Sequence, residues 1–314
     1  MYLYNRIYKT TPHIIHAPAL MHFSKKRLIG HDLLNPYWAY IIKNWEKDTI
    51  AKCKKEIKKE LTIITWNNMD VKGFCEKSMD KLSLNYIVLG KKFKDWRNIN
   101  KITTALEIIN TIKTPYIMGL DGFDTIVLCD PHEALEKFKG MDCEMLFNAE
   151  KNYYPDYGIK ITGRHSITDV WRQFEKNMAK SEWQFLNAGA FIAKTSFYKM
   201  FLVEFMKRHD QLKNNQESLL PPPDLKYKNN PDFNIINDDQ VITHWLFYDY
   251  YPRLRIDYHM NIFFNTIYTC YDEDKIAIKE SKMTAAEHIQ YILRAKVMSY
   301  FLRIYLFYSK VLNE

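Results

Sequence analysis

The stretch Tyr116-Ile-Met-Gly-Leu-Asp121-Gly-Phe-Asp124 decides the fold of this chain. It begins as an apolar run typical of a buried strand. It ends in two carboxylates separated by Gly122, a small residue that lets the backbone turn. In open α/β sheets, ligands bind beyond the carboxyl ends of the strands. The stretch therefore predicts a strand over Pro115–Leu120 and a candidate site where that strand ends.

Strand-like and helix-like segments alternate on both sides of this stretch. Short β-branched or apolar runs predict strands at Leu61–Trp66, Asn85–Leu89, Glu144–Phe147, Ala188–Ala193, Leu254–Asp257 and Lys275–Ile278. Helical spacing predicts helices at Asp70–Leu82, Ile99–Ile112, Pro131–Phe138, Phe197–His209 and Asp238–Tyr248. This order predicts an α/β fold with a Rossmann-like, mixed but mainly parallel sheet and flanking helices.

The composition excludes several classes of protein. Apolar residues make up 47% and charged residues 26% of the 314 residues, which excludes a disordered or fibrous chain. The net charge of +8 permits an anionic partner such as a nucleotide, an acidic membrane surface or nucleic acid. No concentrated basic helix or zinc-binding cysteine pattern accompanies that charge, so we expect no nucleic-acid binding.

The cysteines and the hydropathy of the sequence indicate where in the cell the protein is expected. The 5 cysteines are scattered without a CxxC pair, which favours reduced thiols in the cytoplasm. The first residues lack the apolar run of a signal peptide, and no apolar stretch reaches the roughly 18 residues of a spanning helix. We therefore expect a cytoplasmic protein without a transmembrane helix.

Three segments of different character divide the chain. We expect a helical or irregular extension over residues 1–59, the α/β domain over 60–280, and an amphipathic helix over 281–314. The last contains Val297–Tyr308, an aromatic run with basic neighbours whose helix would be roughly 18 Å long, against a bilayer core of about 30 Å. Such a helix fits peripheral contact with the cytoplasmic face of an anionic membrane, or packing on the core or in a homodimer.

The acid pair Asp121 and Asp124 is the first candidate site. Two carboxylates this close repel each other unless a cation or hydrogen bonds compensate. Oxygen ligands favour a hard ion such as Mg²⁺ or Mn²⁺, which can bridge the phosphates of a nucleotide. The alternative is an Asx-type turn followed by a helix-capping acid.

Three further clusters follow along the chain, each with a simpler alternative. Asn237-Asp238-Asp239-Gln240 opens a predicted helix, where an N-cap and first-turn acids are expected in any case. Phe185-Leu-Asn187-Ala-Gly189-Ala begins a strand with small residues, which indicates close packing or the approach of a ligand. Phe147-Asn148-Ala149-Glu150 ends another strand, and a loop acid is its alternative.

Together these motifs resemble the glycosyltransferase domain of the procollagen lysyl hydroxylase / collagen glucosyltransferase family and its bacterial and viral relatives. The resemblance covers roughly residues 60–265. It rests on an ordered set: the strand ending in Asp121 and Asp124, F-x-A-E followed by Tyr154-Pro155-Asp156, F-L-N-x-G-x-F-I at Phe185–Ile192, D-D-Q at Asp238–Gln240, and I-D-x-x-x-x-I-F-x-N at Ile256–Asn265. The order of the motifs is more specific than any one of them.

This resemblance implies a GT-A fold and transfer of a hexose from a UDP-sugar to a hydroxyl of a glycan or protein. By resemblance, Asp121 and Asp124 hold Mn²⁺ or Mg²⁺ on the diphosphate, and Asp238, Asp239 and Gln240 face the donor sugar and the acceptor. The resemblance also implies a set of donor- and substrate-binding residues, namely Thr65, Trp66, Trp96, Lys101, Glu150, Asn187 and Gly189.

One departure concerns the metal. The family's third ligand is a histidine in a late His-x-Asn-Gly motif, which this sequence lacks. His288 stands near the corresponding distance from the end and is a candidate ligand, although its neighbours are typical of a surface helix. The missing motif supports an alternative function, in which a degenerate member binds a sugar nucleotide or glycan without turnover.

Overall fold

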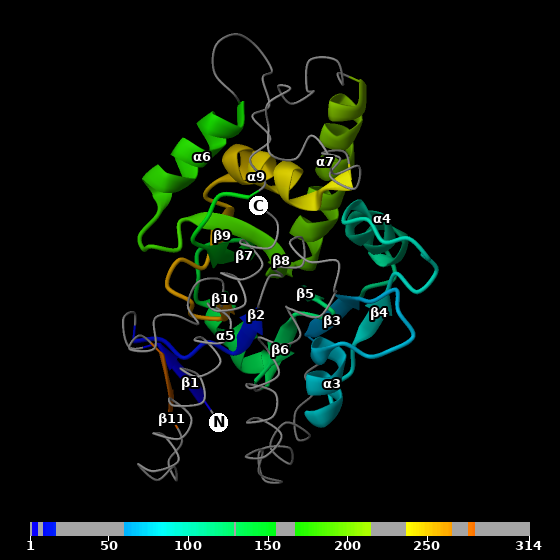
Figure 1. Cartoon of the computed structure of the whole chain (residues 1–314), viewed down its shortest axis with the longest axis vertical. Coiled ribbons are helices and arrows are strands. Elements are labelled where there is room, and N and C mark those ends of the chain that lie inside the picture. The colour runs from blue at the N-terminus through cyan, green and yellow to red at the C-terminus, as the bar shows by residue number, and fades with distance from the viewer. Residues whose placement is uncertain are drawn as a thin grey trace, which may run out of the picture.

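The structure of this chain is a computed structural model, shown in Figure 1. It describes residues 2–5, 9–16, 60–128, 130–154, 167–214, 237–265 and 276–279. The predicted helix over 281–314 and the candidate ligand His288 lie outside these residues, as does the aromatic run at 297–308.

The α/β prediction is confirmed by a six-stranded mixed sheet. Its order is β4 (Ile87–Leu89), β3 (Leu61–Trp66), β5 (Tyr116–Asp121), β8 (Phe185–Lys194), β7 (Met145–Glu150) and β9 (Leu254–Ile256). Strand β8 runs antiparallel to both β5 and β7, and the remaining pairs are parallel. Strand β5 therefore lies inside the sheet, and its carboxyl end carries Asp121.

Residues buried on both faces explain why β5 is a continuous apolar run. Ile117, Met118 and Leu120 are completely buried, as is usual for a strand covered by helices. Gly119 is required by packing, because a Cβ there would lie 2.2 Å from the Phe191 ring of β8. The Phe191 ring in turn packs against Phe147 of β7, with ring centroids 5.6 Å apart.

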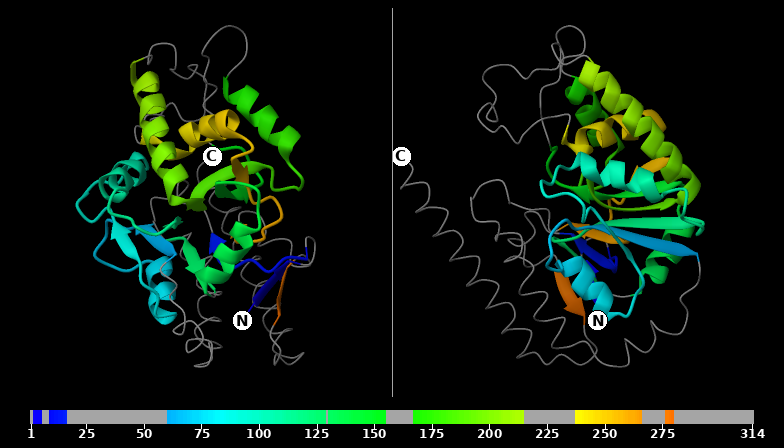
Figure 2. Two further views of the ribbon diagram at one scale, coloured as in Figure 1. Left: turned by 180° about the vertical axis from the view of Figure 1, so that it is seen from behind. Right: turned by 90° about the vertical axis from the view of Figure 1, so that its right-hand side faces the viewer.

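Helices cover both faces of the sheet. Helices α4 (Ile99–Ile108), α6 (Ile167–Met178), α7 (Thr195–Asn214) and α9 (Asp239–Tyr250) lie on one side, whereas α3 (Phe74–Lys81) and α5 (Pro131–Lys139) lie on the other (Figures 1 and 2). Asp130 caps α5 by accepting a hydrogen bond from the His132 amide. None of the helices within the described residues has the length and apolar character needed to cross a membrane.

Residues 2–5 and 9–16, the described part of the expected helical or irregular extension, contain strands. Within them, β1 (Tyr2–Asn5) pairs with β11 (Ile276–Lys279), and β2 (Ile14–His16) pairs with β6 (Thr125–Val127) and β10 (Phe263–Asn265). Strand β2 was missed because three residues are too few to show periodicity. The burial of Ile14 and Ile15 depends on partners far along the chain.

Several predicted helix boundaries also move, and α7 spans Thr195–Asn214 where Phe197–His209 was expected. The helix predicted over Asp70–Leu82 begins only at Phe74, because Asn67 holds the preceding loop by donating to the carbonyl of Val71 at 2.8 Å. Glu76 accepts a hydrogen bond from the Gly73 amide at 3.1 Å, which fixes the start of the helix. The helix predicted over Ile99–Ile112 ends at Ile108. Helix α6 and strands β6 and β10 were not predicted.

Candidate metal and substrate site

The turn after β5 places the acid pair beyond the carboxyl end of the strand. Gly122 allows this turn because a Cβ there would lie 2.3 Å from the backbone oxygen of Trp66. The Gly122 carbonyl accepts a hydrogen bond of 3.1 Å from the Cys75 amide in the first turn of α3. The turn is thus fixed from both sides, and Asp121 and Asp124 lie against the same buried histidine.

That histidine is His16, the last residue of β2. Its Nε2 atom lies 3.8 Å from Asp121 Oδ2 and 3.7 Å from Asp124 Oδ1. His16 is 1% exposed, and Nε2 has no hydrogen-bond partner among the described residues. Strand β2 brings the ring there because His16 pairs with Thr125, the residue directly after Asp124.

These three residues could hold a metal ion. One ligand atom from each of them lies within 4.8 Å of the others, and all three side chains are mostly buried. A buried imidazole nitrogen that faces two carboxylates and lacks a partner fits a cation bound between them. Because one donor is a nitrogen, the set suits Mn²⁺ or a later first-row ion better than Mg²⁺, which prefers oxygen ligands.

Burial and neighbouring charges shift the pKa values of Asp121 and Asp124 in opposite directions. Burial, aided by the Asp124 charge and opposed by Lys101, raises the pKa of Asp121 to about 6. Burial also opposes ionisation of Asp124, but the His16 ring and the Lys101 ammonium outweigh it and hold the pKa of Asp124 below its usual range. Buried carboxylates of this kind need a compensating cation.

Lys101 of α4 joins this group to the later acidic pair. Its Nζ atom lies 2.7 Å from Asp121 Oδ1 and 3.2 Å from Asp239 Oδ2. Burial opposes the charge on Lys101, but the Asp121 and Asp239 carboxylates outweigh burial and raise its pKa. Lys101 contacts Asp121 Oδ1, whereas the other oxygen, Oδ2, faces His16. The two motifs therefore meet at one ammonium group.

The Asp-Asp-Gln motif combines a helix cap with a buried network. Asp238 is the N-cap of α9, and its Oδ1 accepts from the Gln240 amide at 2.8 Å. Burial and the adjacent Asp239 raise the pKa of Asp238 to about 7. The Gln240 side chain accepts from the Ala188 amide at 3.2 Å and donates to Glu150 Oε1 at 2.6 Å, which ties α9 to β8 and β7.

Burial favours the neutral form of Glu150. Burial raises its pKa to about 8, against the opposing hydrogen bonds from Gln240 and Asn187. Asn187 also accepts from the Gly189 amide at 3.0 Å. Gly189 leaves room for two of the candidate metal ligands. A Cβ there would lie 2.2 Å from His16 Cε1 and 2.9 Å from Asp121 Oδ2.

Two predicted donor-side residues, Thr65 and Trp66, lie beside the carboxyl end of β5, where Trp66 pairs with Asp121. Thr65 and Trp66 end β3 and are buried. The Trp66 ring packs against Phe191, and its Nε1 donates to the Lys101 carbonyl at 3.2 Å. Trp66 thus supports the backbone of Lys101. Trp96 packs over Gly90, where a Cβ would lie 2.6 Å from the indole ring.

The most important site residue that the sequence did not predict is His16. Its only signal was a pair of histidines, His13 and His16, flanking two isoleucines near the start of the chain. Nothing in that segment indicates that it pairs with residues 125–127 and 263–265.

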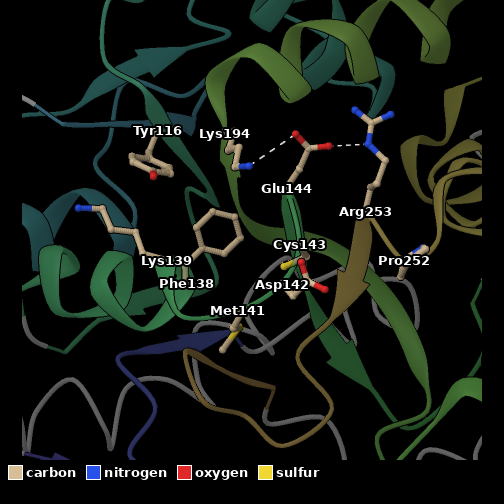
Figure 3. A pocket seen from close by; sticks show the side chains of 10 residues that line it. All are labelled: Tyr116, Phe138, Lys139, Met141, Asp142, Cys143, Glu144, Lys194, Pro252 and Arg253. Atoms are coloured by element: carbon tan, nitrogen blue, oxygen red, sulfur yellow. Dashed lines mark hydrogen bonds and ion pairs between the residues drawn. The ribbon is translucent and has the colours of Figure 1, made fainter.

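A separate cavity lies at the opposite edge of the sheet (Figure 3). It has a volume of about 350 Å³ and includes Tyr116, at the amino end of β5. Glu144 forms ion pairs there with Lys194 and Arg253. The other two charged lining residues, Lys139 and Asp142, form ion pairs with residues outside the cavity. The cavity lies at the other end of β5 from Asp121.

Comparisons with known proteins do not place the chain in a family. No protein-family model and no curated protein matches the sequence. A solved structure titled "Crystal Structure of A197 from STIV" is 13% identical, with 63% of this chain and 82% of that chain covered, at a TM-score of 0.32. A likeness at this level carries no argument about function.

Proposed function

We propose that this protein is a metal-dependent glycosyltransferase that moves a hexose from a nucleotide sugar, UDP-linked, to a hydroxyl of a glycan or protein. The observation that carries the proposal is the position of Lys101 between Asp121 and Asp239. It joins the acid pair after β5 to the acidic motif of α9, at the edge of the sheet where α/β proteins bind ligands.

The cation would be held by His16, Asp121 and Asp124. When bound, Mn²⁺ supplies positive charge that stabilises the diphosphate as it leaves the sugar. Lys101 adds a fixed ammonium in the same buried region. A buried ammonium acts more strongly on developing negative charge than one in water, because the local dielectric constant is low.

The later motif would act on the sugar side of the scissile bond. The transition state of glycosyl transfer has oxocarbenium character, which a nearby carboxylate stabilises. Asp239, oriented by Lys101, suits this role or the orientation of the acceptor hydroxyl. Glu150, neutral near pH 7 and fixed by Gln240, can donate a hydrogen bond to a sugar hydroxyl.

Calorimetric titration with UDP, with and without Mn²⁺, tests the nucleotide and metal roles. We expect Mn²⁺ to strengthen UDP binding at least tenfold in the wild type and to have no effect in the double variant Asp121→Asn with Asp124→Asn. The matched control is Asp142→Asn, a fully exposed acid at the opposite edge, which should behave as the wild type. An affinity for UDP that is the same with and without Mn²⁺, and that is unchanged in the double variant, would contradict the proposal.

Release of UDP separates a transferase from the alternative, a degenerate protein that binds a sugar nucleotide or glycan without turnover. We expect slow hydrolysis of one of the common UDP-hexoses by the Mn²⁺-loaded protein. It should be lost in Asp239→Asn and retained in Asp142→Asn. Binding without release from any donor would favour the degenerate protein. The expected acceptor, homodimer and membrane contact remain predictions.

A further inference from the structure

Asn148 of β7 is the side chain in contact with the far side of the His16 ring. Its Nδ2 atom lies 3.1 Å from His16 Nδ1, and Asn148 is completely buried. Its Oδ1 atom has no hydrogen-bond partner among the described residues. An amide with one engaged end and one buried free end is a costly arrangement unless the free end has a use.

A bulge in β8 brings these groups together. The pairing of β7 with β8 shifts from Phe147 opposite Phe191 to Asn148 opposite Asn187, which leaves Ala188–Ala190 without partners on β7. Bulges of this kind re-aim side chains beside functional sites. Here the bulge contains Gly189, which leaves room for the His16 ring, and it begins opposite Asn148.

The direction of the hydrogen bond determines which ring nitrogen of His16 carries the proton. The Asn148 Nδ2 group can only donate, so His16 Nδ1 accepts and the proton of the neutral ring resides on Nε2. That Nε2–H faces the two carboxylates, at 3.7 and 3.8 Å. A protonated Nε2 has no lone pair for a metal ion. Coordination therefore requires the proton to move to Nδ1 and requires an acceptor beside Nδ1.

We propose that Asn148 is a positioning residue whose amide reverses when a cation binds. Without the ion its NH₂ group donates to Nδ1, and with the ion its carbonyl accepts from Nδ1–H, which leaves the Nε2 lone pair toward Asp121 and Asp124. This inference rests on the metal site of the proposed function and deepens it. Asparagine suits both states, whereas aspartate can only accept and leucine can do neither.

The tautomer of His16 is a direct readout of this role. We would record histidine ¹⁵N NMR spectra of the full-length, metal-free wild type and of the near-isosteric variants Asn148→Asp and Asn148→Leu. We expect Nε2–H in the wild type and a protonated Nδ1 in Asn148→Asp. A merely structural role would not move this signal. A metal-free wild type with its proton on Nδ1, or an Asp variant with the wild-type tautomer, would overturn the proposal.

Mn²⁺ affinity, measured by electron paramagnetic resonance on the same proteins, supplies the second readout. We expect Asn148→Leu to bind Mn²⁺ about 10–100-fold more weakly than the wild type, and Asn148→Asp to bind at least as tightly. Undiminished affinity in a folded Leu variant, or weakened affinity in the Asp variant, would overturn the inference. If the Leu variant fails to fold, the Asp variant decides alone.

The two proposals fail separately. Mn²⁺ binding with the expected tautomers but no release of UDP from any donor would remove the transferase and leave the role of Asn148 intact. UDP release with undiminished Mn²⁺ affinity in Asn148→Leu would do the reverse. A wild type that binds no Mn²⁺ would overturn both.

Discussion

The two ends of β5 carry the same types of charged residue in opposite circumstances. At the amino end, Glu144 pairs with Lys194 and Arg253, and the last two side chains are 47% and 56% exposed. At the carboxyl end, Asp121 and Asp239 contact one buried ammonium, that of Lys101, and the Asp124 charge also acts on it. Exposed ion pairs contribute little, whereas buried acids in excess of their cations need a further positive charge. The comparison therefore points to the carboxyl end as the place for a metal ion.

Removing one cation at each end should give the largest difference. Lys101→Met leaves two buried carboxylates uncompensated, so we expect a loss of about 3–5 kcal/mol in the free energy of unfolding. Lys194→Met at the other end should cost less than about 1 kcal/mol. Urea denaturation of both variants measures the difference, and equal losses would contradict the contrast between the two ends.

The pH dependence of stability should reflect the buried acid Glu150. Its pKa is about 8 in the folded protein, above the ordinary value of 4.5. The folded state therefore binds more protons between these values, and stability falls as pH rises through the window, by a few kcal/mol at about 1.4 kcal/mol per pKa unit.

Glu150→Gln should flatten this dependence, because an amide does not ionise. Asp238, whose pKa is raised to about 7, contributes a fall of the same sign in both proteins and cancels in the comparison. Unfolding free energies from pH 5 to pH 9 provide the measurement. Parallel curves for the two proteins would show that Glu150 is ionised in the folded state at neutral pH.

Added Mn²⁺ should stabilise the protein by a comparable or smaller amount. A ligand that binds only the folded state contributes about 2.7 kcal/mol at a hundredfold excess over its Kd. We expect the unfolding temperature to rise with Mn²⁺ in the wild type and in Lys194→Met, but not in His16→Ala. A shift of equal size in His16→Ala would place the ion elsewhere.

The smallest expected effect concerns the glycine beside the histidine. Gly189→Ala places a Cβ 2.2 Å from His16 Cε1, so the ring must move, at a cost of about 1–3 kcal/mol, and Mn²⁺ binding should weaken. Gly140→Ala is the control, because its nearest contact would be 3.4 Å, and we expect a change within about 1 kcal/mol. Unchanged Mn²⁺ affinity in Gly189→Ala would remove His16 from the ligand set.

Sequence reasoning succeeded where long segments carry their own signal. The apolar run before Asp121 predicted β5, and Asp238 ahead of a helical pattern predicted the N-cap of α9. It failed where structure depends on distant partners: β2 is three residues long, and only its pairing with β6 and β10 makes His16 a neighbour of Asp121. Trp66, which the resemblance assigns to the donor, packs against Phe191, and its contact with a donor stays a prediction.

The place of His16 in the chain has a consequence for biosynthesis. Its strand lies between β6 and β10, so one of its two neighbours, Phe263–Asn265, is made long after His16 has left the ribosome. A nascent chain that has reached Asp124 has all three candidate ligands but lacks the strand that completes their framework. Under the proposed metal role, firm binding of the ion would have to wait until translation has passed Asn265, and metal binding would be a late event in the maturation of this protein.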